Sequence, residues 1–424
     1  MDVAQAPGGT ATETAAPRRA EAPEGRIAFL VGNLRGGGVQ RITVILANAM
    51  AARGYRVDLV SGEAEGELCE QVDGRVRIVP LARASYFPAR LAALRADWGG
   101  AFRMLRPLFS GQNDSTTIHF FPALAAYLRE ERPASLFAAT PFMNIEAVLA
   151  RKLAGVPTRV VVSERTHFTA SKSKKARRSQ VLAPVMRRAY LAADAITAVS
   201  HGVAADLASS LDIPREAVTV LYNPTLTPDF SERVAQPLDH PWFRPGEPPV
   251  LLGVGRVAFQ KDFPTLVRAF AAVRKRGTAC RLVLVGRYKK TDGIMGLAEE
   301  LGVREHVDLV GFQANPLPWM REARLLVLSS RFEGFPNVLL EALACGTPIV
   351  STDCPSGPRE ILEEGRYGAL VPIGDDAAMA EAIAAALDRP RDPERLRAHA
   401  AKFDHRSAID RYLEVLLGTT DILR

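Results

Sequence analysis

The sequence predicts an α/β protein with two doubly wound, Rossmann-like domains that face each other across a central cleft. Short apolar runs alternate with helical patterns in two successive series, which is typical of parallel sheets covered by helices on both faces. A proline-rich stretch separates the two series. The length of 424 residues also favours two domains, because a single hydrophobic core rarely grows that large.

The first domain is expected over residues 25–223, after a disordered tail at residues 1–24 that has no apolar core of the kind found in signal peptides. A strand at residues 26–32 leads into a glycine-rich turn and then into a helix at residues 39–53 with one apolar face. Further strands are expected at residues 56–60, 135–139, 159–163 and 195–199.

The proline-rich linker is expected at residues 224–249, where seven prolines remove backbone donors and oppose regular structure. The second domain follows over residues 250–402, and the segment 403–424 contains a helix that we expect to pack back on the N-terminal domain. The strands of the second domain are expected at residues 250–253, 281–285, 307–310, 325–328 and 348–351. Its helices are expected after Pro264, Gly293, Pro316 and Pro336, with another at residues 376–387.

The composition excludes several classes of protein. No apolar run approaches the roughly 20 residues that a membrane-spanning helix needs. The four cysteines are far apart and lack CxxC spacing, which argues against a disulfide scaffold or a cysteine zinc site. We therefore expect a cytoplasmic protein.

The positive charge is concentrated in the first half of the chain. The net charge is +7, and residues 165–188 hold eight Lys or Arg residues and no Asp or Glu. Such a surface should attract anions, and an anionic membrane on the inner face of the plasma membrane is one expected partner. A nucleic-acid-binding module is an alternative, but no aromatic stacking residues interleave with this basic run.

The motif with the most specific chemistry spans residues 331–346 and contains Glu333 and Glu341. Pro336 suits the first position of a helix, because its missing N–H needs no partner there. Glu333 then lies in the loop and Glu341 inside the helix, so both carboxylates can face the cleft. The helix N-terminus should attract a phosphate. The residues around it that we expect to bind this ligand are Gly334, Phe335, Pro336, Asn337 and Val338.

The stretch EGFPNVLLEALACGTPIVST at residues 333–352 resembles the signature of the retaining glycosyltransferases of family 4. These enzymes have the GT-B fold and use nucleotide-activated sugars. The resemblance covers nearly the whole chain after the tail. It implies that Glu333 lies against the donor sugar as a catalytic residue and that Glu341 binds the ribose hydroxyls of the nucleotide.

A second motif at residues 253–262 follows the first strand of the second domain and contains Arg256 and Lys261. Two cations five residues apart on a strand-to-helix turn can converge on a diphosphate, and the resemblance assigns them that role. The segment also fits G-x-G-x-x-A, which suggests a nicotinamide-binding oxidoreductase. That alternative needs a helix beginning at the glycines and an acidic residue about 20 residues later, and the sequence has neither.

Three further segments are expected to face the cleft. Gly37 and Gly38 let the backbone approach a ligand closely, and they resemble the glycine-rich loop that the family places near the donor phosphate and the acceptor. Past a strand of the first domain, His167 is a candidate catalytic residue and Arg165 a candidate acceptor ligand. Glu360 lies in a segment that resembles the subgroup building lipid-linked or surface polysaccharides, and it is a candidate donor ligand.

We therefore expect a retaining glycosyltransferase that moves a sugar from a nucleotide diphosphate donor, with UDP as the favoured nucleotide, to a hydroxyl of a glycan acceptor. The basic surface favours a polyprenyl-diphosphate-linked acceptor in polysaccharide or glycoconjugate biosynthesis. We expect no metal cofactor, because the His and acidic residues show no metal-ligand spacing. A non-catalytic nucleotide-sugar binder is a further alternative.

Overall fold

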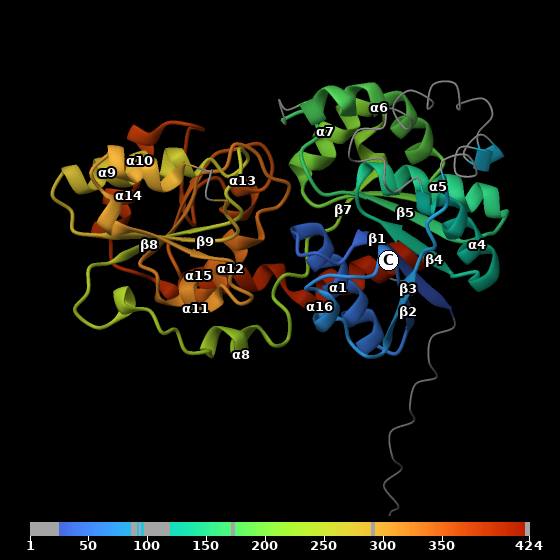
Figure 1. Cartoon of the computed structure of the whole chain (residues 1–424), viewed down its shortest axis with the longest axis horizontal. Helices are drawn as coiled ribbons and strands as arrows, with labels where there is room; N and C mark the ends of the chain where they lie inside the picture. Colours follow the sequence, from blue (N-terminus) through green and yellow to red (C-terminus); the bar gives the residue numbers. More distant parts are fainter. Residues whose placement is uncertain are drawn as a thin grey trace, which may run out of the picture.

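The computed structural model describes residues 25–85, 91–92, 95–96, 119–170, 174–289 and 293–419. These residues form two α/β lobes that lie side by side (Figure 1). Each lobe is built on one parallel sheet, with seven strands in the N-terminal lobe and six in the C-terminal lobe. The predicted fold class is therefore confirmed.

The N-terminal sheet has the strand order β3-β2-β1-β4-β5-β6-β7. The order reverses between β1 and β4, which is the point where doubly wound sheets bind ligands at the carboxyl ends of their strands. Its strands are β1 (Arg26–Asn33), β2 (Arg56–Glu63), β3 (Val76–Pro80), β4 (Ser135–Ala138), β5 (Arg159–Glu164), β6 (Ala195–Ala198) and β7 (Val218–Val220).

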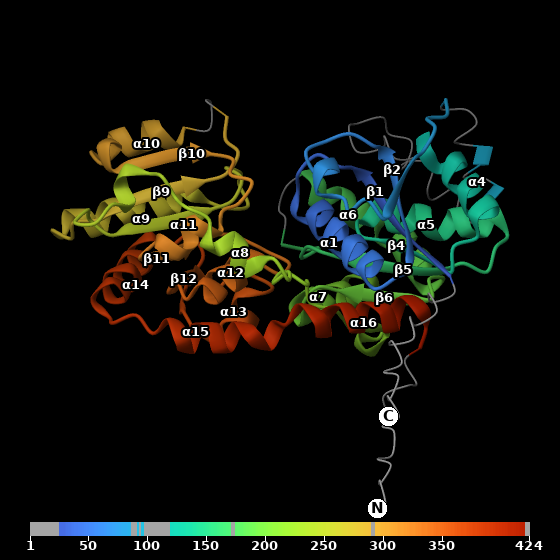
Figure 2. The same cartoon turned by 90° about the horizontal axis from the view of Figure 1, so that it is seen from below.

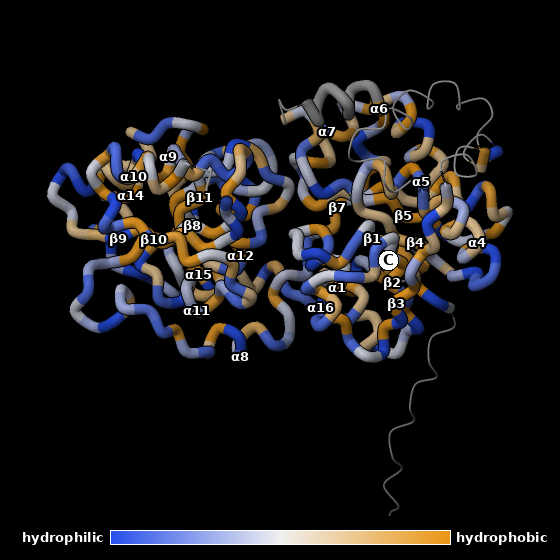
Figure 3. Tube along the Cα trace, in the orientation of Figure 1, coloured by the Kyte–Doolittle hydropathy of each residue, from blue (hydrophilic) through white to orange (hydrophobic). Residues whose placement is uncertain are grey.

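Helices cover both faces of this sheet because its strands are apolar on both sides, as the orange tube in Figure 3 shows. On β1, Phe29 packs toward α1 (Gly38–Ala52) and the C-terminal helix, while Leu30 packs toward the helices of the opposite face. The helices of that opposite face are α4 (Phe121–Glu131), α5 (Pro141–Ala154), α6 (Lys174–Leu191) and α7 (His201–Leu211).

The C-terminal sheet repeats the same order, β10-β9-β8-β11-β12-β13, and its switch point lies between β8 and β11. Its strands are β8 (Val250–Val254), β9 (Arg281–Val285), β10 (Val307–Gly311), β11 (Leu325–Leu328), β12 (Ile349–Thr352) and β13 (Ala369–Val371). Its helices are α9 (Phe263–Lys275), α10 (Ile294–Glu300), α11 (Leu317–Glu322), α12 (Asn337–Cys345), α13 (Pro358–Ile361), α14 (Asp376–Asp388) and α15 (Pro393–Ala400).

Two segments connect the lobes. The proline-rich segment contains the short helix α8 (Phe230–Ala235) and a 3₁₀ turn (Pro241–Phe243), where no regular structure was expected. The last helix, α16 (His405–Leu417), begins at the cap Asp404 and returns to the N-terminal lobe (Figure 2). Its Tyr412 is buried against Phe137 of β4, with ring centroids 6.0 Å apart. The chain therefore crosses between the lobes twice.

The sequence analysis missed three strands, β3, β7 and β13. All three are short: β7 and β13 have three residues each, and β3 has five. β7 and β13 also lie at the edges of their sheets, as β3 does. Runs this short carry little periodic signal, and their pairing with a neighbouring strand decides their conformation. No helix among the described residues is long and apolar enough to span a membrane.

Candidate active site

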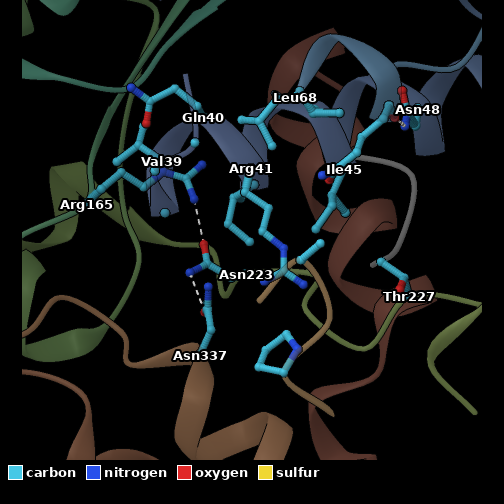
Figure 4. Close-up of a pocket in the computed structure, with 18 of the residues that line it drawn as sticks. Val39, Gln40, Arg41, Ile45, Asn48, Leu68, Arg165, Asn223, Thr227 and Asn337 are labelled. Carbon is cyan, nitrogen blue, oxygen red and sulfur yellow. Dashed lines mark hydrogen bonds between the residues drawn. The ribbon is translucent and has the colours of Figure 1, made fainter. Parts of the chain in front are cut away.

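A cleft of about 1720 Å³ lies between the lobes, and residues from the carboxyl ends of β1, β5, β8, β9 and β11 line it. The two switch points thus open into the same space. Figure 4 shows part of its wall, where side chains of α1 face Asn223, Thr227 and Asn337. This common cavity is where groups from both domains can act on one pair of ligands.

The loop between β8 and α9 brings the two predicted cations to the cleft. Arg256 and Lys261 both line it. Arg256 is exposed and has no ion-pair partner within the described parts of the chain, so its guanidinium is available to a ligand. Ser329 donates to the carbonyl of Lys261 at 2.7 Å, which straps this loop to the one after β11.

Glu333 lies in the loop after β11 and is almost completely buried. Its Oε1 accepts hydrogen bonds from Lys261 Nζ at 2.7 Å and Ser330 Oγ at 2.6 Å, and its Oε2 accepts one from Gln260 Nε2 at 3.3 Å. These donors stabilise the ionised carboxylate, whose burial would otherwise be costly. The pair also fixes Lys261 beside the position expected for the donor sugar.

Helix α12 follows Glu333 and points its N-terminus toward the cleft. It begins at Asn337, so Pro336 occupies the capping position and not the first helical position that we predicted. No side chain caps this end, and the first turn has no acidic residue. Gly334, Phe335 and Asn337 line the cleft, whereas Pro336 and Val338 do not.

Glu341 lies one turn inside α12 and is 3% exposed. Burial predicts that this carboxylate has a partner, and the structure supplies Arg41 of α1, whose Nη2 lies 3.6 Å from Glu341 Oε1. Arg41 reaches from the opposite lobe into the cleft (Figure 4). The proposed ribose ligand is therefore held by an interdomain ion pair.

The lobes touch closely at Gly334. A Cβ atom on this residue would lie 2.0 Å from the carbonyl oxygen of Arg165, so no side chain fits there. Ser200, the cap of α7, donates to the carbonyl of Gly334 at 2.8 Å. The N–H of His167 donates to the carbonyl of Glu333 at 3.4 Å. Backbone contacts thus join the Glu333 loop to the N-terminal lobe.

Arg165 belongs to a hydrogen-bonded chain that crosses between the lobes (Figure 4). Its Nη1 donates to Asn223 Oδ1 at 2.5 Å, and Asn223 Nδ2 donates to Asn337 Oδ1 at 2.8 Å. The guanidinium also lies over the rings of Phe137 and Tyr412, at 5.5 and 5.8 Å from their centroids. Arg165 lines the cleft but is 9% exposed, so it is placed to position Asn337.

Five predicted site residues do not line the cleft: Pro336, Val338, Glu341, His167 and Glu360. His167 lies in the loop after β5, and its Nδ1 is 3.1 Å from Oδ2 of Asp206 in α7. Burial lowers the pKa of His167, although Asp206 opposes this shift. Glu360 accepts hydrogen bonds from the N–H of His201 at 3.1 Å and from Tyr222 Oη at 2.6 Å. In this conformation Glu360 therefore joins the two lobes.

The glycine-rich turn lies at the cleft. Gly37 and Gly38 line the cleft at the start of α1, and no side chain caps this helix. The sequence analysis missed Gln260, Ser330 and Asn223, which bond to Glu333 or Arg165. Ser330 and Gln260 lie within three residues of predicted site residues. Their closeness in sequence to those motifs is the signal that could have identified them as site residues.

The described residues contain no cluster of three or more His, Cys, Asp or Glu side chains that could hold a metal ion. Lys261, which pairs with Glu333, and Arg256 both line the cleft. These cations can offset the charge of a bound diphosphate.

A buried carboxyl lies directly before Arg165. Glu164 is 3% exposed at the end of β5, and its Oε1 accepts hydrogen bonds from the hydroxyl of Tyr190 and from Asn144 Nδ2. Burial raises the pKa of Glu164 to about 7, although the hydrogen bonds from Tyr190 and Asn144 oppose this rise.

Two family models match the chain. The model described as Glycosyltransferase Family 4 matches residues 36–225, and the model described as Glycosyl transferases group 1 matches residues 237–403. Together they include both walls of the cleft.

Several similar curated proteins are named as glycosyltransferases. A Campylobacter jejuni enzyme is 29% identical over 65% of this chain and 74% of its own length. It is named N-acetylgalactosamine-N,N'-diacetylbacillosaminyl-diphospho-undecaprenol 4-alpha-N-acetylgalactosaminyltransferase. The lipopolysaccharide 1,6-galactosyltransferase of Salmonella typhimurium is 30% identical over 43% of this chain, and the aligned part spans only 49% of that enzyme.

Solved structures share the fold at lower identity. Alr3699/HepE of Anabaena, determined in complex with UDP and glucose, has a TM-score of 0.70 and 17% identity, with 93% of this chain and 100% of that chain covered. The lipopolysaccharide outer core galactosyltransferase WaaB has a TM-score of 0.65 and 20% identity, with 93% and 99% covered.

Glu164 should make stability depend on pH. Its folded pKa of about 7 exceeds the ordinary value of 4.5, so the unfolded chain ionises first as pH rises. The free energy of unfolding should therefore fall between pH 4.5 and 7. Glu164→Gln should be more stable than wild type at pH 8, by on the order of 3 kcal/mol, and about equal at pH 4. Urea unfolding at both values measures this, with exposed Glu300→Gln as the control. An equal difference at both values would contradict it.

Proposed function

The chain belongs to the glycosyltransferases of the GT-B fold, with a family 4 domain followed by a group 1 domain, and from this premise we propose a specific reaction. The enzyme transfers a sugar from UDP-sugar to a hydroxyl of a glycan acceptor, with retention of anomeric configuration. The acceptor is linked to polyprenyl diphosphate and serves polysaccharide or glycoconjugate biosynthesis. The observation that carries the proposal is the Lys261–Glu333 ion pair just before the N-terminus of α12, in a cleft that Arg256 also lines.

The residues divide the work between the two halves of the donor. Arg256 and Lys261 bind the diphosphate, and the uncapped N-terminus of α12 adds partial positive charge. These groups stabilise the negative charge that grows on the departing diphosphate, a fixed electrostatic effect that usually supplies the largest part of catalysis. Glu341 accepts hydrogen bonds from the ribose hydroxyls, and Glu333 holds the donor sugar.

The proposed chemistry uses no protein nucleophile. The acceptor hydroxyl attacks the anomeric carbon from the side of the leaving group, the bond to the diphosphate breaks, and a phosphate oxygen takes the acceptor proton. Glu333 is already held by Lys261 and Ser330, which suits a positioning and electrostatic role. The retaining course rests on the resemblance to family 4.

The donor and acceptor proposals draw on the similar proteins. Alr3699/HepE was solved with UDP and glucose, which supports UDP as the nucleotide. The Campylobacter jejuni enzyme acts on a saccharide joined to diphospho-undecaprenol, which supports a lipid-linked acceptor. Such an acceptor places the enzyme at the inner face of the plasma membrane, as a peripheral protein.

The two glutamates should separate binding from turnover. Glu341→Gln should weaken UDP binding by about 1 to 3 kcal/mol, because a charged acceptor of the ribose hydroxyls is lost. Glu333→Gln should leave UDP affinity unchanged and lower kcat, because this carboxylate faces the sugar. Calorimetry with UDP and turnover assays measure the two effects, with exposed Glu381→Gln as the control. Equal losses for both variants in both assays would overturn the assignments. If neither the wild type nor any variant shows turnover, the result would favour a non-catalytic nucleotide-sugar binder.

Activity should not require a divalent metal. Arg256, Lys261 and the N–H groups of α12 can offset the diphosphate charge themselves. Transfer rates should therefore survive an excess of EDTA. Loss of activity in EDTA with recovery in Mn²⁺ would show that the proposed diphosphate site is wrong.

Apart from Arg165, which is buried in the cleft, the basic run at residues 165–188 should hold the enzyme on anionic membranes. Cations near an anionic leaflet contribute on the order of 1 kcal/mol each before salt screens them. Flotation should recover the protein with phosphatidylglycerol vesicles at low salt and release it at roughly molar salt. Five Ser substitutions should abolish this binding, at Lys172, which lies outside the described residues, and at Lys174, Lys175, Arg177 and Arg178.

The matched control replaces five cations of the C-terminal lobe by Ser, and it should still float. These residues are Arg268, Lys275, Arg276, Arg304 and Arg389. If wild type fails to float at low salt, the membrane proposal is wrong while the transfer reaction is unaffected.

A further inference from the structure

The cleft continues well past the donor-binding loops. Its wall follows α1 along Val39, Ile45 and Ala49 to Arg53, just beyond the end of the helix. Arg41 in the first turn pairs with Glu341, so this end of α1 lies at the proposed nucleotide site. Twelve residues separate Arg41 from Arg53, and a rise of 1.5 Å per residue places their Cα atoms roughly 18 Å apart. The cavity therefore has two separate ends.

Cations outnumber acids on the wall of the cleft. Ten Lys or Arg residues line it, against three Asp or Glu residues. Arg256 and Lys261 lie at the nucleotide end, where the donor diphosphate is expected. Arg53, Arg75 and Arg406 line the other end, so a second anion is the ligand that these residues fit.

Arg406 is the most available of the distal cations. Its backbone is fixed, because its N–H donates to Asp404 Oδ1 at 2.7 Å and its carbonyl accepts from Arg53 Nη2 at 3.2 Å. Its side chain is exposed and forms no ion pair within the described ranges. Arg53 and Arg75 are paired with Asp410 and Asp73, at 2.5 and 2.7 Å.

We propose that this distal end, formed by Arg53, Arg75 and Arg406, binds the diphosphate group of the acceptor. The inference rests on the proposed function and states how the acceptor lies in the cleft. Its reacting hydroxyl lies beside Glu333, and its diphosphate lies at the far end of α1. The distance between the two ends requires an extended acceptor, with several sugar units between hydroxyl and diphosphate. The half-buried apolar side chains of Val39, Ile45 and Ala49 form a floor for those sugars.

The test uses inorganic diphosphate as the probe and fills the donor site first. The full-length protein is titrated with UDP, and inorganic diphosphate is then titrated into the UDP-saturated protein by calorimetry. UDP already occupies Arg256 and Lys261, so any further binding of diphosphate reports the distal site. Wild type should show this second binding. Arg406→Gln should weaken this second binding by about tenfold, the loss of one charge-assisted contact, and leave UDP affinity unchanged. Arg411→Gln is the matched control: it removes an exposed Arg from the same helix, away from the cleft, and should change neither affinity.

Three outcomes would overturn the distal site. The first is that diphosphate does not bind to the UDP-saturated protein, and the second is that Arg406→Gln binds it as tightly as wild type does. The third is that phosphatidylglycerol vesicles displace the diphosphate, which would make these arginines a membrane contact. Failure of UDP itself to bind is seen in the first titration and counts against the proposed function instead. In transfer assays, Arg406→Gln should raise the KM of a diphosphate-linked acceptor and leave that of a neutral glycoside unchanged.

Discussion

The close approach of the two lobes at Gly334 is the constraint on which the site depends. A Cβ there would overlap the carbonyl oxygen of Arg165, so only glycine allows the loop that carries Glu333 to lie against the N-terminal lobe. Ser200 adds a hydrogen bond from the cap of α7 to the Gly334 carbonyl. Because the loop connects β11 to α12, this contact contributes to where the carboxylate of Glu333 and the helix N-terminus stand relative to α1.

The charged side chains at the cleft fall into two groups. Some are neutralised within the protein, as in the pairs Lys261–Glu333 and Arg41–Glu341. The paired groups hold loops and lobes in place, and burial makes their separation costly. Others, such as Arg256 and Arg406, extend into the cleft with no acidic partner among the described residues. An unpaired guanidinium keeps its full capacity for a phosphate, so these two residues mark where anionic groups of the substrates are expected.

The connections between the lobes bear on how the enzyme opens. Tyr222 stacks on Phe335, with centroids 5.2 Å apart, and donates to Glu360. Phe335 belongs to the loop of Glu333, and Glu360 accepts from the first N–H of α7. Any rotation of one lobe must therefore break contacts made by the active-site loop itself. Opening for substrate exchange and the geometry of catalysis are coupled through these residues.

Much of the local structure was determined by the sequence alone. Periodic apolar runs predicted ten of the strands closely, and the motifs around Glu333 and Arg256 predicted the loops that line the cleft, because these signals lie within short stretches of chain. The retaining chemistry, the donor and the acceptor stay predictions.

Only the tertiary structure decided which distant residues meet. Three contacts join segments far apart in the chain: the pairing of Arg41 with Glu341, the hydrogen bond from the N–H of His201 to Glu360, and the hydrogen bond from Arg165 to Asn223. No local pattern encodes such contacts, since they follow from how the two lobes pack against each other. The three short strands, β3, β7 and β13, likewise depend on a neighbouring strand, because hydrogen bonds to that neighbour define them.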